Sequence, residues 1–432
     1  MTLQSKTAEI QEKARRHLSP VMTRVTEMVV ERAKGARFWT SDGEEYIDFV
    51  SGVAVNAIGH AHEAMVEAIQ KQAEAFIHFG LNYGYYETAA NLAEKLAEIT
   101  PGSLDTVFFS NSGGEAIDGA LKLAKAVTGR PGIIAFEGSF HGRTMGATAI
   151  TASSSKYRKF YEPILGEVYH APYPYPGQLR GVKEGEITEY CLGQIQKIFD
   201  LRIDPSRVAA IIIEPVMGEG GYFPAPPEFI QELRRLCDSH GILLVFDEVQ
   251  TGFGRTGKMF AAEHSGVTPD ILVLAKALSG GMPLGAIVAA RELHEKWPAG
   301  GHGSTFGGNP ISCAAALANI KILQEENLIE RSSKLGERIV TRLRSSLKGL
   351  DAVNEVRGIG LMIGIEFESS IAASAVPHIK QKALENKLLI MNCGVYGQTI
   401  RLMLPLNIEE EVLEKGLSIL EKAIKETLSK EE

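Results

Sequence analysis

The chain has 432 residues, 44% hydrophobic and 23% charged, and a formal net charge of −8 at pH 7. At roughly 150 residues per domain, this length predicts more than one structural unit, and the negative charge disfavours nucleic acid or acidic membrane as a partner. The four cysteines lack the paired spacing of zinc or redox sites. No apolar run reaches the roughly 18 residues of a membrane span, and the first residues lack an apolar signal core. We therefore expect a soluble cytoplasmic enzyme without a metal.

The first third of the chain mixes helical and strand patterns. Residues 1 to about 35 carry apolar residues that predict a helical lead-in, and two short strands are expected on either side of the Asp42–Gly43 turn. A strand over 106–110 leads through NSGG into a helix. The aromatic and proline-rich stretch 150–185 shows no clear period, and we expect it to be an ordered surface connection.

Strands and helices alternate from Pro205 to Ala290. The apolar runs AAIIIEPV, LLVFDEV and ILVLAK are typical of strands buried on both faces. Such alternation predicts a mostly parallel sheet with helices on both faces. Beyond Asn309, a long helix, the strand-like VRGIGLMIGIEF and TIRLML and a closing amphipathic helix indicate a smaller α+β unit.

Two of these strands end at side chains that carry chemistry. Asp247 ends one apolar run and Lys276 follows another, and the carboxyl ends of parallel strands face the ligand crevice of an α/β sheet. Alone, such an aspartate is usually a satisfied strand-end residue and such a lysine usually reaches solvent. Together they suit pyridoxal phosphate, because a lysine holds its aldehyde as a Schiff base and an aspartate keeps its pyridine nitrogen protonated.

The NSGGE segment places Gly113 and Gly114 at the start of a helix. Their backbone N–H groups and the helix dipole could hold a phosphate there, although a Gly-Gly pair alone is more often a simple turn. The segment does not match the GxGxxG pattern of a dinucleotide site.

Successive motifs resemble class III pyridoxal-phosphate-dependent aminotransferases over nearly the whole chain, and among these the 4-aminobutyrate aminotransferases most. The motifs are FSNSGGEAIDGALKLAK, AFEGSFHGRT, IIIEPVMGEGG, LLVFDEVQTGFGRTG, PDILVLAKALSGG and STFGGNP. The resemblance implies an α/β fold of the fold-type-I class, with a mostly parallel seven-stranded-type sheet and a small α+β domain. It implies an N-terminal segment 1–59 contributing to the small domain, a large cofactor-binding domain 60–320, a C-terminal small domain 321–432, and a homodimer with active sites at its interface.

The resemblance also implies roles around the cofactor. Lys276 would form the Schiff base and carry the proton, Asp247 would pair with the pyridine nitrogen, and Gln250 would hydrogen-bond the phenolic oxygen. Phe140 and Val249 would pack on the two ring faces.

The phosphate would be held by Gly113 and Gly114, joined by Thr305 of the partner subunit. His141 is expected beside the cofactor. The family usually has Ser or Thr where Gly114 stands, so we expect a lost hydroxyl donor and weaker cofactor retention.

For the substrate, the resemblance implies that Arg401 grips an α-carboxylate and that Arg143 contacts the distal carboxylate of an ω-amino acid. Glu219 would pair with Arg401 when the substrate has no α-carboxylate and swing away when it has one. Glu214 would order the arginine side of the pocket, and Val53 would lie near the donor.

These roles predict a ping-pong transfer of an amino group from an ω-amino acid, such as 4-aminobutyrate, to an oxo acid, such as 2-oxoglutarate. The alternatives are an acetylornithine or other ω-amine aminotransferase and an amino acid racemase or epimerase on the same scaffold. A nucleotide-binding oxidoreductase and a catalytically silent binding protein are weaker alternatives.

Overall fold

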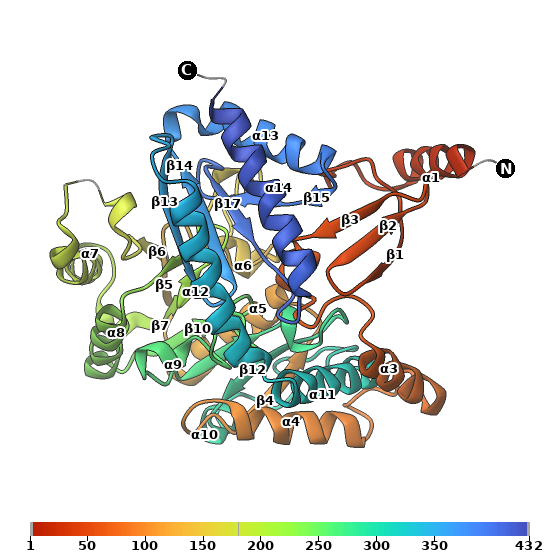
Figure 1. Ribbon diagram of the computed structural model, residues 1–432. Helices are drawn as coiled ribbons and strands as arrows, with labels where there is room; N and C mark the ends of the chain where they lie inside the picture. Colours follow the sequence, from red (N-terminus) through yellow and green to blue (C-terminus); the bar gives the residue numbers. More distant parts are fainter. Residues whose placement is uncertain (1–2, 180, 430–432) are drawn as a thin grey trace.

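A computed structural model describes residues 3–179 and 181–429. Its centre is a seven-stranded sheet in the order β4-β12-β11-β10-β7-β5-β6 (Figure 1). The strands are β4 (Thr106–Ser110), β5 (Gly132–Phe136), β6 (Val168–Ala171), β7 (Val208–Ile213), β10 (Leu243–Asp247), β11 (Ile271–Leu274) and β12 (Gly285–Ala289). β12 runs in the direction opposite to the other six strands, so the predicted mostly parallel seven-stranded sheet is confirmed.

The central strands alternate their side chains between two apolar layers. One layer includes Ile212 and Val245 and packs on α5 (Gly113–Thr128), while the other includes Ile211 and Leu244 and packs on α8 (Pro227–His240). Because both faces are covered by helices, every residue of β7, β11 and β12 is buried. This explains why the sequence of these strands is apolar throughout.

The C-terminal part forms a second, antiparallel sheet in the order β13-β14-β17-β16. Its strands are β13 (Val353–Ile359), β14 (Met362–Phe367), β16 (Met391–Cys393) and β17 (Thr399–Leu402). The helices α12 (Leu328–Ser346), α13 (Ser369–Glu385) and α14 (Glu410–Leu428) accompany this sheet (Figure 1). The smaller α+β unit expected beyond Asn309 is thus present.

Both ends of the chain meet in a third sheet. The strands β1 (Val30–Lys34), β2 (Arg37–Thr40) and β3 (Glu45–Asp48) are followed in order by β15 (Leu388–Leu389), which runs parallel to β3. The hairpin around Asp42–Gly43 is therefore present. The division into segments 1–59, 60–320 and 321–432 remains a prediction.

Two expectations differ from the structure. The helical lead-in ends early, because α1 covers Leu3–His17 and β1 occupies the end of the predicted helix. The stretch 150–185 is more than a surface connection, since it contains the edge strand β6 and the buried Tyr173, whose hydroxyl donates to the carbonyl of Glu214 at 3.0 Å. Among the prolines and aromatic residues of this stretch, the four residues of β6 show no strand pattern that the sequence would reveal.

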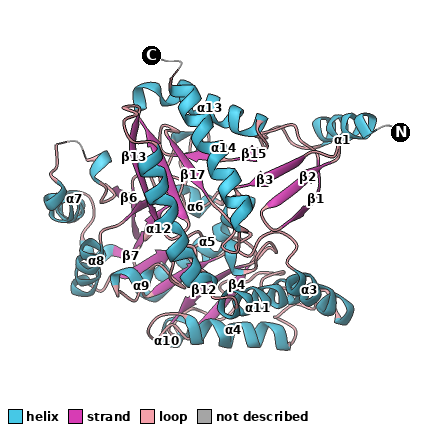
Figure 2. Ribbon diagram, in the orientation of Figure 1, coloured by secondary structure: helices cyan, strands magenta, loops and turns pink. Residues whose placement is uncertain are grey.

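The remaining helices lie around these sheets (Figure 2). They are α2 (Ser51–Ala54), α3 (Glu63–Ala75), α4 (Glu87–Ile99), α6 (Met145–Ile150), α7 (Ile187–Leu201), α9 (Ala262–Ser265), α10 (Arg291–Glu295) and α11 (Pro310–Glu325). Two short strands, β8 (Val216–Met217) and β9 (Phe223–Pro224), form a hairpin.

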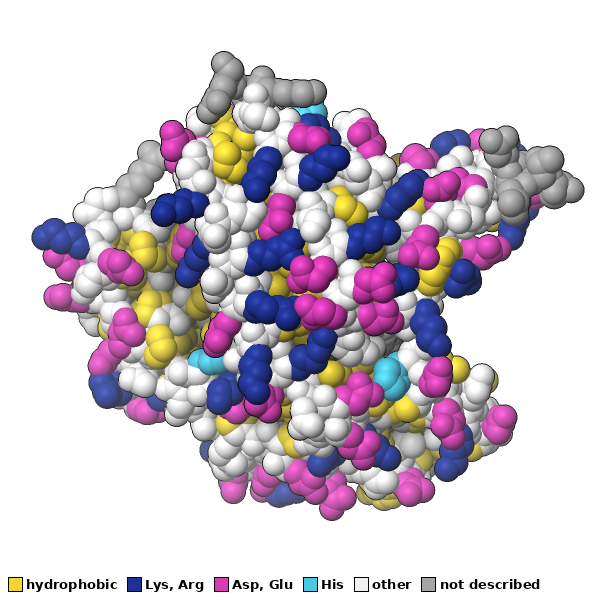
Figure 3. All heavy atoms as spheres, in the orientation of Figure 1, with side chains coloured by type: hydrophobic (Ala, Val, Ile, Leu, Met, Phe, Trp, Pro, Cys, Tyr) yellow, Lys and Arg dark blue, Asp and Glu magenta, His cyan; other side chains and the backbone are white. Residues whose placement is uncertain are grey.

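Charges of both signs intermingle on the face that carries α12 and α14 (Figure 3). Arg342 on α12 pairs with Glu414 and Glu421 on α14 at 2.6 and 2.8 Å. No helix within residues 3–179 and 181–429 combines the length and apolarity needed to cross a membrane.

Candidate functional site

A cavity of about 360 Å³ opens beside the carboxyl ends of β10 and β11. It brings together nine of the residues named from the sequence. Four come from the start of α5 and the loop after β5: Gly113, Gly114, Phe140 and His141. Five lie at or just beyond the ends of buried strands: Glu214, Asp247, Val249, Gln250 and Lys276.

Lys276 is delivered to the cavity by the end of β11. It follows Ala275 directly and starts a single turn of 3₁₀ helix with a φ of 44°, in the left-handed region that is costly for a residue with a Cβ. Loss of hydration lowers the pKa of its amine, while the nearby Asp247 and Glu214 act in the opposite sense. A lysine with a lowered pKa has more of the neutral amine that can attack an aldehyde or accept a proton.

Asp247 is held by two donors at the end of β10. One carboxylate oxygen lies 2.7 Å from Nδ1 of His141, and the other accepts the backbone N–H of Val249 at 3.0 Å. The side chain is only 4% exposed. An acid fixed on both oxygens and surrounded by apolar strands is suited to pair with a cationic N–H of a ligand.

The turn before α5 has the geometry of an anion site. The Ser112 side chain caps the helix by accepting from the backbone N–H of Glu115, and α5 begins at Gly113, so the first N–H groups have no partner within the helix. A Cβ on Gly113 would lie 3.0 Å from Val249, and one on Gly114 would lie 3.2 Å from Thr144. Glycine therefore lets the turn pack closely against the cavity wall.

Glu214 ties two loops of the site together. Its carboxylate accepts the backbone N–H of Phe140 at 2.9 Å and that of Gly218 at 2.9 Å. Burial raises the pKa of Glu214, although His141 opposes the shift. The oxygen Oε1 of Gln250 is buried and has no partner among the described residues, so this amide is available to a polar ligand in the cavity.

Apart from Glu214, the expected substrate residues lie outside the cavity. Arg401 on β17 is 3% exposed and pairs with Glu219 at 2.9 Å. The guanidinium of Arg143 lies over the ring of Tyr157, 5.1 Å from its centroid. Val53 packs beside the cluster that contains Tyr222 and Met403.

Thr305 lies outside the cavity as well, and it is exposed in a loop beside the 58% exposed Phe306. A residue that reaches into a second subunit must be accessible in this way.

Sequence reasoning missed several lining residues, among them Val55, Asn111, Ser112 and Met282. The place of Ser112 could have been predicted from the sequence, because a serine just before a helix is a favoured N-cap. The place of Val55 could not, since Val55 comes from a turn far away along the chain.

The cavity wall fits pyridoxal phosphate on three observations. The first N–H groups of α5, which have no carbonyl partner within the helix, suit a phosphate. A carboxylate held on both oxygens suits a protonated pyridine nitrogen, and a lysine of lowered pKa suits an aldehyde. These groups surround one cavity and come from three separate segments.

Comparisons with known proteins agree with this fit. A family model described as aminotransferase class-III matches residues 19–424. The acetylornithine aminotransferase of Methanopyrus kandleri is 44% identical, over 91% of this chain and 93% of that one. The 5-aminovalerate aminotransferase of Pseudomonas putida is 40% identical and the 4-aminobutyrate aminotransferase of Escherichia coli is 38% identical, each over 92% of this chain and 93% of its own.

Solved structures share the fold. A Bacillus anthracis aminotransferase superposes with a TM-score of 0.92 at 29% identity, covering 99% of this chain and 100% of its own. The ornithine aminotransferase of Toxoplasma gondii, described with partial occupancy of PLP at its active site, has a TM-score of 0.87 at 29% identity, covering 98% of this chain and 95% of its own.

Proposed function

Because the chain belongs to the class-III aminotransferase family, whose members depend on pyridoxal phosphate and share the type-I fold, we propose that it moves an amino group from an ω-amino acid to an oxo acid. The preferred donor is 4-aminobutyrate or a close analogue, and the acceptor is 2-oxoglutarate. The two half-reactions alternate in a ping-pong cycle. The aminotransferase names of the relatives favour amino transfer over the isomerase, oxidoreductase and binding-protein alternatives.

The observation that carries the substrate class is the 2.9 Å ion pair between Arg401 and Glu219. A buried arginine needs a counter-charge. Glu219 supplies this counter-charge to Arg401 while the bound substrate has no α-carboxylate. When an oxo acid binds, its α-carboxylate takes the place of Glu219 beside Arg401. One arginine can then serve both half-reactions.

When bound, pyridoxal phosphate supplies an electron sink next to the substrate carbon. Lys276 would hold its aldehyde as a Schiff base, and once the substrate amine has displaced it, the free Nζ would accept the substrate proton, for which its lowered pKa suits it. Asp247 would keep the pyridine nitrogen protonated, and His141 holds Asp247 in place. Gln250 would donate to the phenolic oxygen through Nε2.

The remaining residues bind and orient. Phe140 and Val249 would pack on the ring faces, and Gly113 and Gly114 would bind the phosphate. Arg143 contacts the distal carboxylate of the donor, beside Val53, and Glu214 orders the turn that carries Glu219.

We also propose that the protein is a homodimer in which Thr305 of the partner subunit completes each phosphate site. The support is a run of exposed aromatic side chains, with Phe79 58%, Tyr83 84% and Tyr85 100% exposed. Apolar surface of this kind marks interaction sites. Sedimentation of the wild type and of Tyr85→Asp tests the proposal, and a monomeric, fully active wild type would overturn it.

The substrate is tested with a panel of donors: 4-aminobutyrate, 5-aminovalerate, N-acetylornithine and 2-aminoadipate. Each is assayed against 2-oxoglutarate and pyruvate, with Lys276→Ala as the inactive control. We expect 4-aminobutyrate with 2-oxoglutarate to give the highest kcat/KM and parallel double-reciprocal lines. Failure of every ω-amino donor would refute the proposal.

A second candidate is acetylornithine aminotransferase activity, which the 44% identity to the Methanopyrus kandleri enzyme favours. A clear preference for N-acetylornithine in the same panel would establish it.

A further inference from the structure

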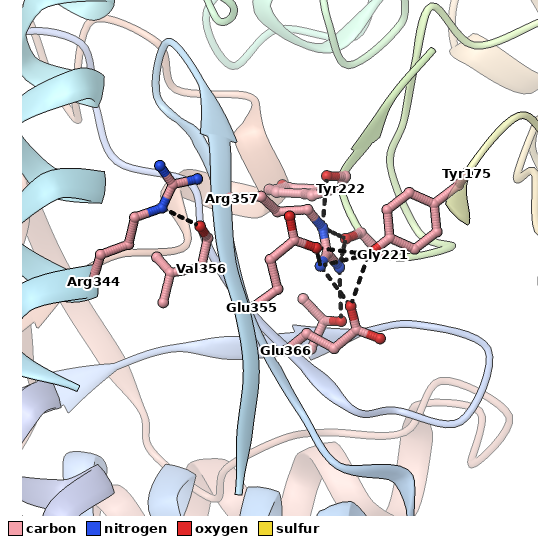
Figure 4. Close-up of polar contacts among 9 residues, drawn as sticks. Tyr175, Gly221, Tyr222, Arg344, Glu355, Val356, Arg357 and Glu366 are labelled. Carbon is pink, nitrogen blue, oxygen red and sulfur yellow. Dashed lines mark hydrogen bonds and ion pairs between the residues drawn. The ribbon is translucent and has the colours of Figure 1, made fainter. Parts of the chain in front are cut away.

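Arg357 lies on β13 and reaches out of the C-terminal sheet to the turn after β8 (Figure 4). Its Nε donates to the carbonyl oxygens of Gly221 and Tyr222, both at 3.1 Å, and its Nη2 donates to Gly221 at 2.6 Å. The side chain is 5% exposed. One buried guanidinium therefore binds two consecutive carbonyls of a turn that belongs to a different part of the fold.

The guanidinium itself is fixed from several sides. Its Nη1 contacts the carboxylates of Glu355 at 2.9 Å and Glu366 at 2.5 Å. The ring of Phe223 lies 3.9 Å from its central carbon, and Tyr175 stacks on that ring and donates to Glu355 at 2.7 Å. Two carboxylates balance the arginine charge, which is a condition for burying it.

The turn held in this way is the one that carries Glu219. Glu219 stands two residues before Gly221, and its own carbonyl accepts the N–H of Gly394 at 2.8 Å. Gly221 and Tyr222 have φ values of 141° and 63°. A tyrosine in the left-handed region is strained, and such a conformation persists only where its surroundings hold it.

In the C-terminal sheet, Arg357 and Arg401 both lie against the turn that carries Glu219. Arg357 pairs with Gly364 across β13 and β14, and Gly364 pairs with Arg401 across β14 and β17. Directly opposed residues share one face of a sheet, so the two arginines flank a glycine. A Cβ on Gly364 would lie 3.0 Å from Cγ2 of Thr399, 3.4 Å from Cβ of Tyr222 and 3.5 Å from the oxygen of Gly221. The turn therefore lies directly on the sheet at this glycine.

From this arrangement we propose that Arg357 is a positioning residue that sets the substrate selectivity of the enzyme. It anchors the backbone after Glu219 to the sheet that carries Arg401, so that only the Glu219 side chain moves between the two half-reactions. The inference rests on the proposed roles of Glu219 and Arg401. If the turn loosens, Glu219 pairs less well with Arg401. The reaction with donors that lack an α-carboxylate then slows, because they need this pair, while the reaction with oxo acids does not, because their own α-carboxylate binds Arg401.

The test compares half-reactions in Arg357→Lys, which keeps the charge and loses the fork of donors. We expect kcat/KM for 4-aminobutyrate to fall about tenfold, as for a contact worth about 1.4 kcal/mol. We expect kcat/KM for 2-oxoglutarate to change less than about twofold in the same variant. Calorimetry with glutarate, a dicarboxylate that does not react, should show affinity at least equal to that of the wild type.

Two further variants make the result specific. In a Glu219→Gln background, Arg357→Lys should change the donor-to-acceptor ratio less than about twofold, because its effect passes through Glu219. The matched control is Arg344→Lys. Arg344 donates to the carbonyl of Val356 on the same strand at 2.8 Å, but from α12 and away from the turn (Figure 4), so it should leave the ratio unchanged.

If Arg357→Lys does not fold, Gly364→Ala adds a Cβ that would lie 3.0 Å from Cγ2 of Thr399 and in contact with the turn, without removing a charge, and a shift in ratio in the same direction is expected. An equal loss for donor and acceptor, or an undiminished effect in the Glu219→Gln background, would overturn the inference. A wild type that fails to react with any ω-amino donor would instead overturn the proposed function.

Discussion

Nδ1 of His141 lies 2.7 Å from a carboxylate oxygen of Asp247, and the two side chains are 0% and 4% exposed. The other imidazole nitrogen is buried and has no partner in the described part of the chain. Among the described residues, the side-chain hydrogen bond of His141 is the one to Asp247, and we expect the histidine to act on the reaction through that carboxylate.

Replacing His141 by Phe should lower kcat about tenfold at saturating cofactor, because Asp247 loses a hydrogen bond worth about 1–3 kcal/mol. KM for the amino donor should stay the same, since His141 is not expected to touch the substrate. His141→Asn, which retains a polar group, should recover part of kcat. Steady-state kinetics check this, and a variant with changed KM and wild-type kcat would contradict it.

Gly114→Ser should tighten cofactor binding about tenfold, because it adds a hydroxyl donor to a charged phosphate. Part of this gain is lost to crowding, as the new Cβ would lie 3.2 Å from Cγ2 of Thr144. Gly114→Ala introduces the same Cβ without the hydroxyl and is the matched control. Titration of the apoenzyme with pyridoxal phosphate measures both affinities, and equal values for the two variants would rule out the hydroxyl effect.

The turn between β13 and β14 packs directly on the loop that follows Asp247. A Cβ on Gly360 would lie 2.4 Å from the carbonyl carbon of Thr256 and 2.5 Å from the nitrogen of Gly257, and Gly360 has a φ of 54°. Gly349 has a φ of 86° with nothing within 4 Å of such a Cβ.

Gly349→Ala should therefore cost about 1–2 kcal/mol of unfolding free energy, the left-handed penalty alone. Gly360→Ala should cost about 3 kcal/mol or more, because backbone atoms must also move. Denaturant unfolding of the two apoenzyme variants gives both values. Equal losses of unfolding free energy in the two variants would show that the contact between Gly360 and the loop at Thr256 can relax at no cost.

His170 on β6 should make the protein sensitive to acid. Burial lowers its pKa to about 4, and its Nε2 lies 3.2 Å from the carbonyl oxygen of Ile150. As the pH falls below 6.5, the unfolded chain binds a proton at this site while the folded chain does not, so stability is lost between pH 6.5 and 4.

At pH 4.5 the protonation of His170 should cost about 2 kcal/mol relative to pH 7.5. His170→Gln keeps a donor for the carbonyl of Ile150 and does not titrate. Between pH 7.5 and 4.5, the variant should therefore lose about 2 kcal/mol less unfolding free energy than the wild type loses. His17→Gln, at an exposed position, is the control. Identical pH profiles for the wild type and His170→Gln would contradict the prediction.

The sequence alone was enough to predict the mostly parallel sheet and the two strand ends that carry Asp247 and Lys276. The reason is local: a strand buried on both faces must be apolar throughout, so the polar residue that ends it stands out. The same reasoning failed for β6, a short edge strand in which His170 and two neighbours are only partly buried. An edge strand is not required to be apolar and leaves little pattern.

Only the tertiary structure decided which distant residues meet. Arg357 donates to the carbonyls of Gly221 and Tyr222, and His141 contacts Asp247, and both contacts join segments far apart in the chain. The pairing of Arg401 with Glu219 was expected from the resemblance to a family and not from any pattern in the residues themselves. Sequence periodicity reports which face of an element is buried. It carries no information on which other element covers that face, because that depends on how strands are ordered and sheets are packed, and those are properties of the folded chain.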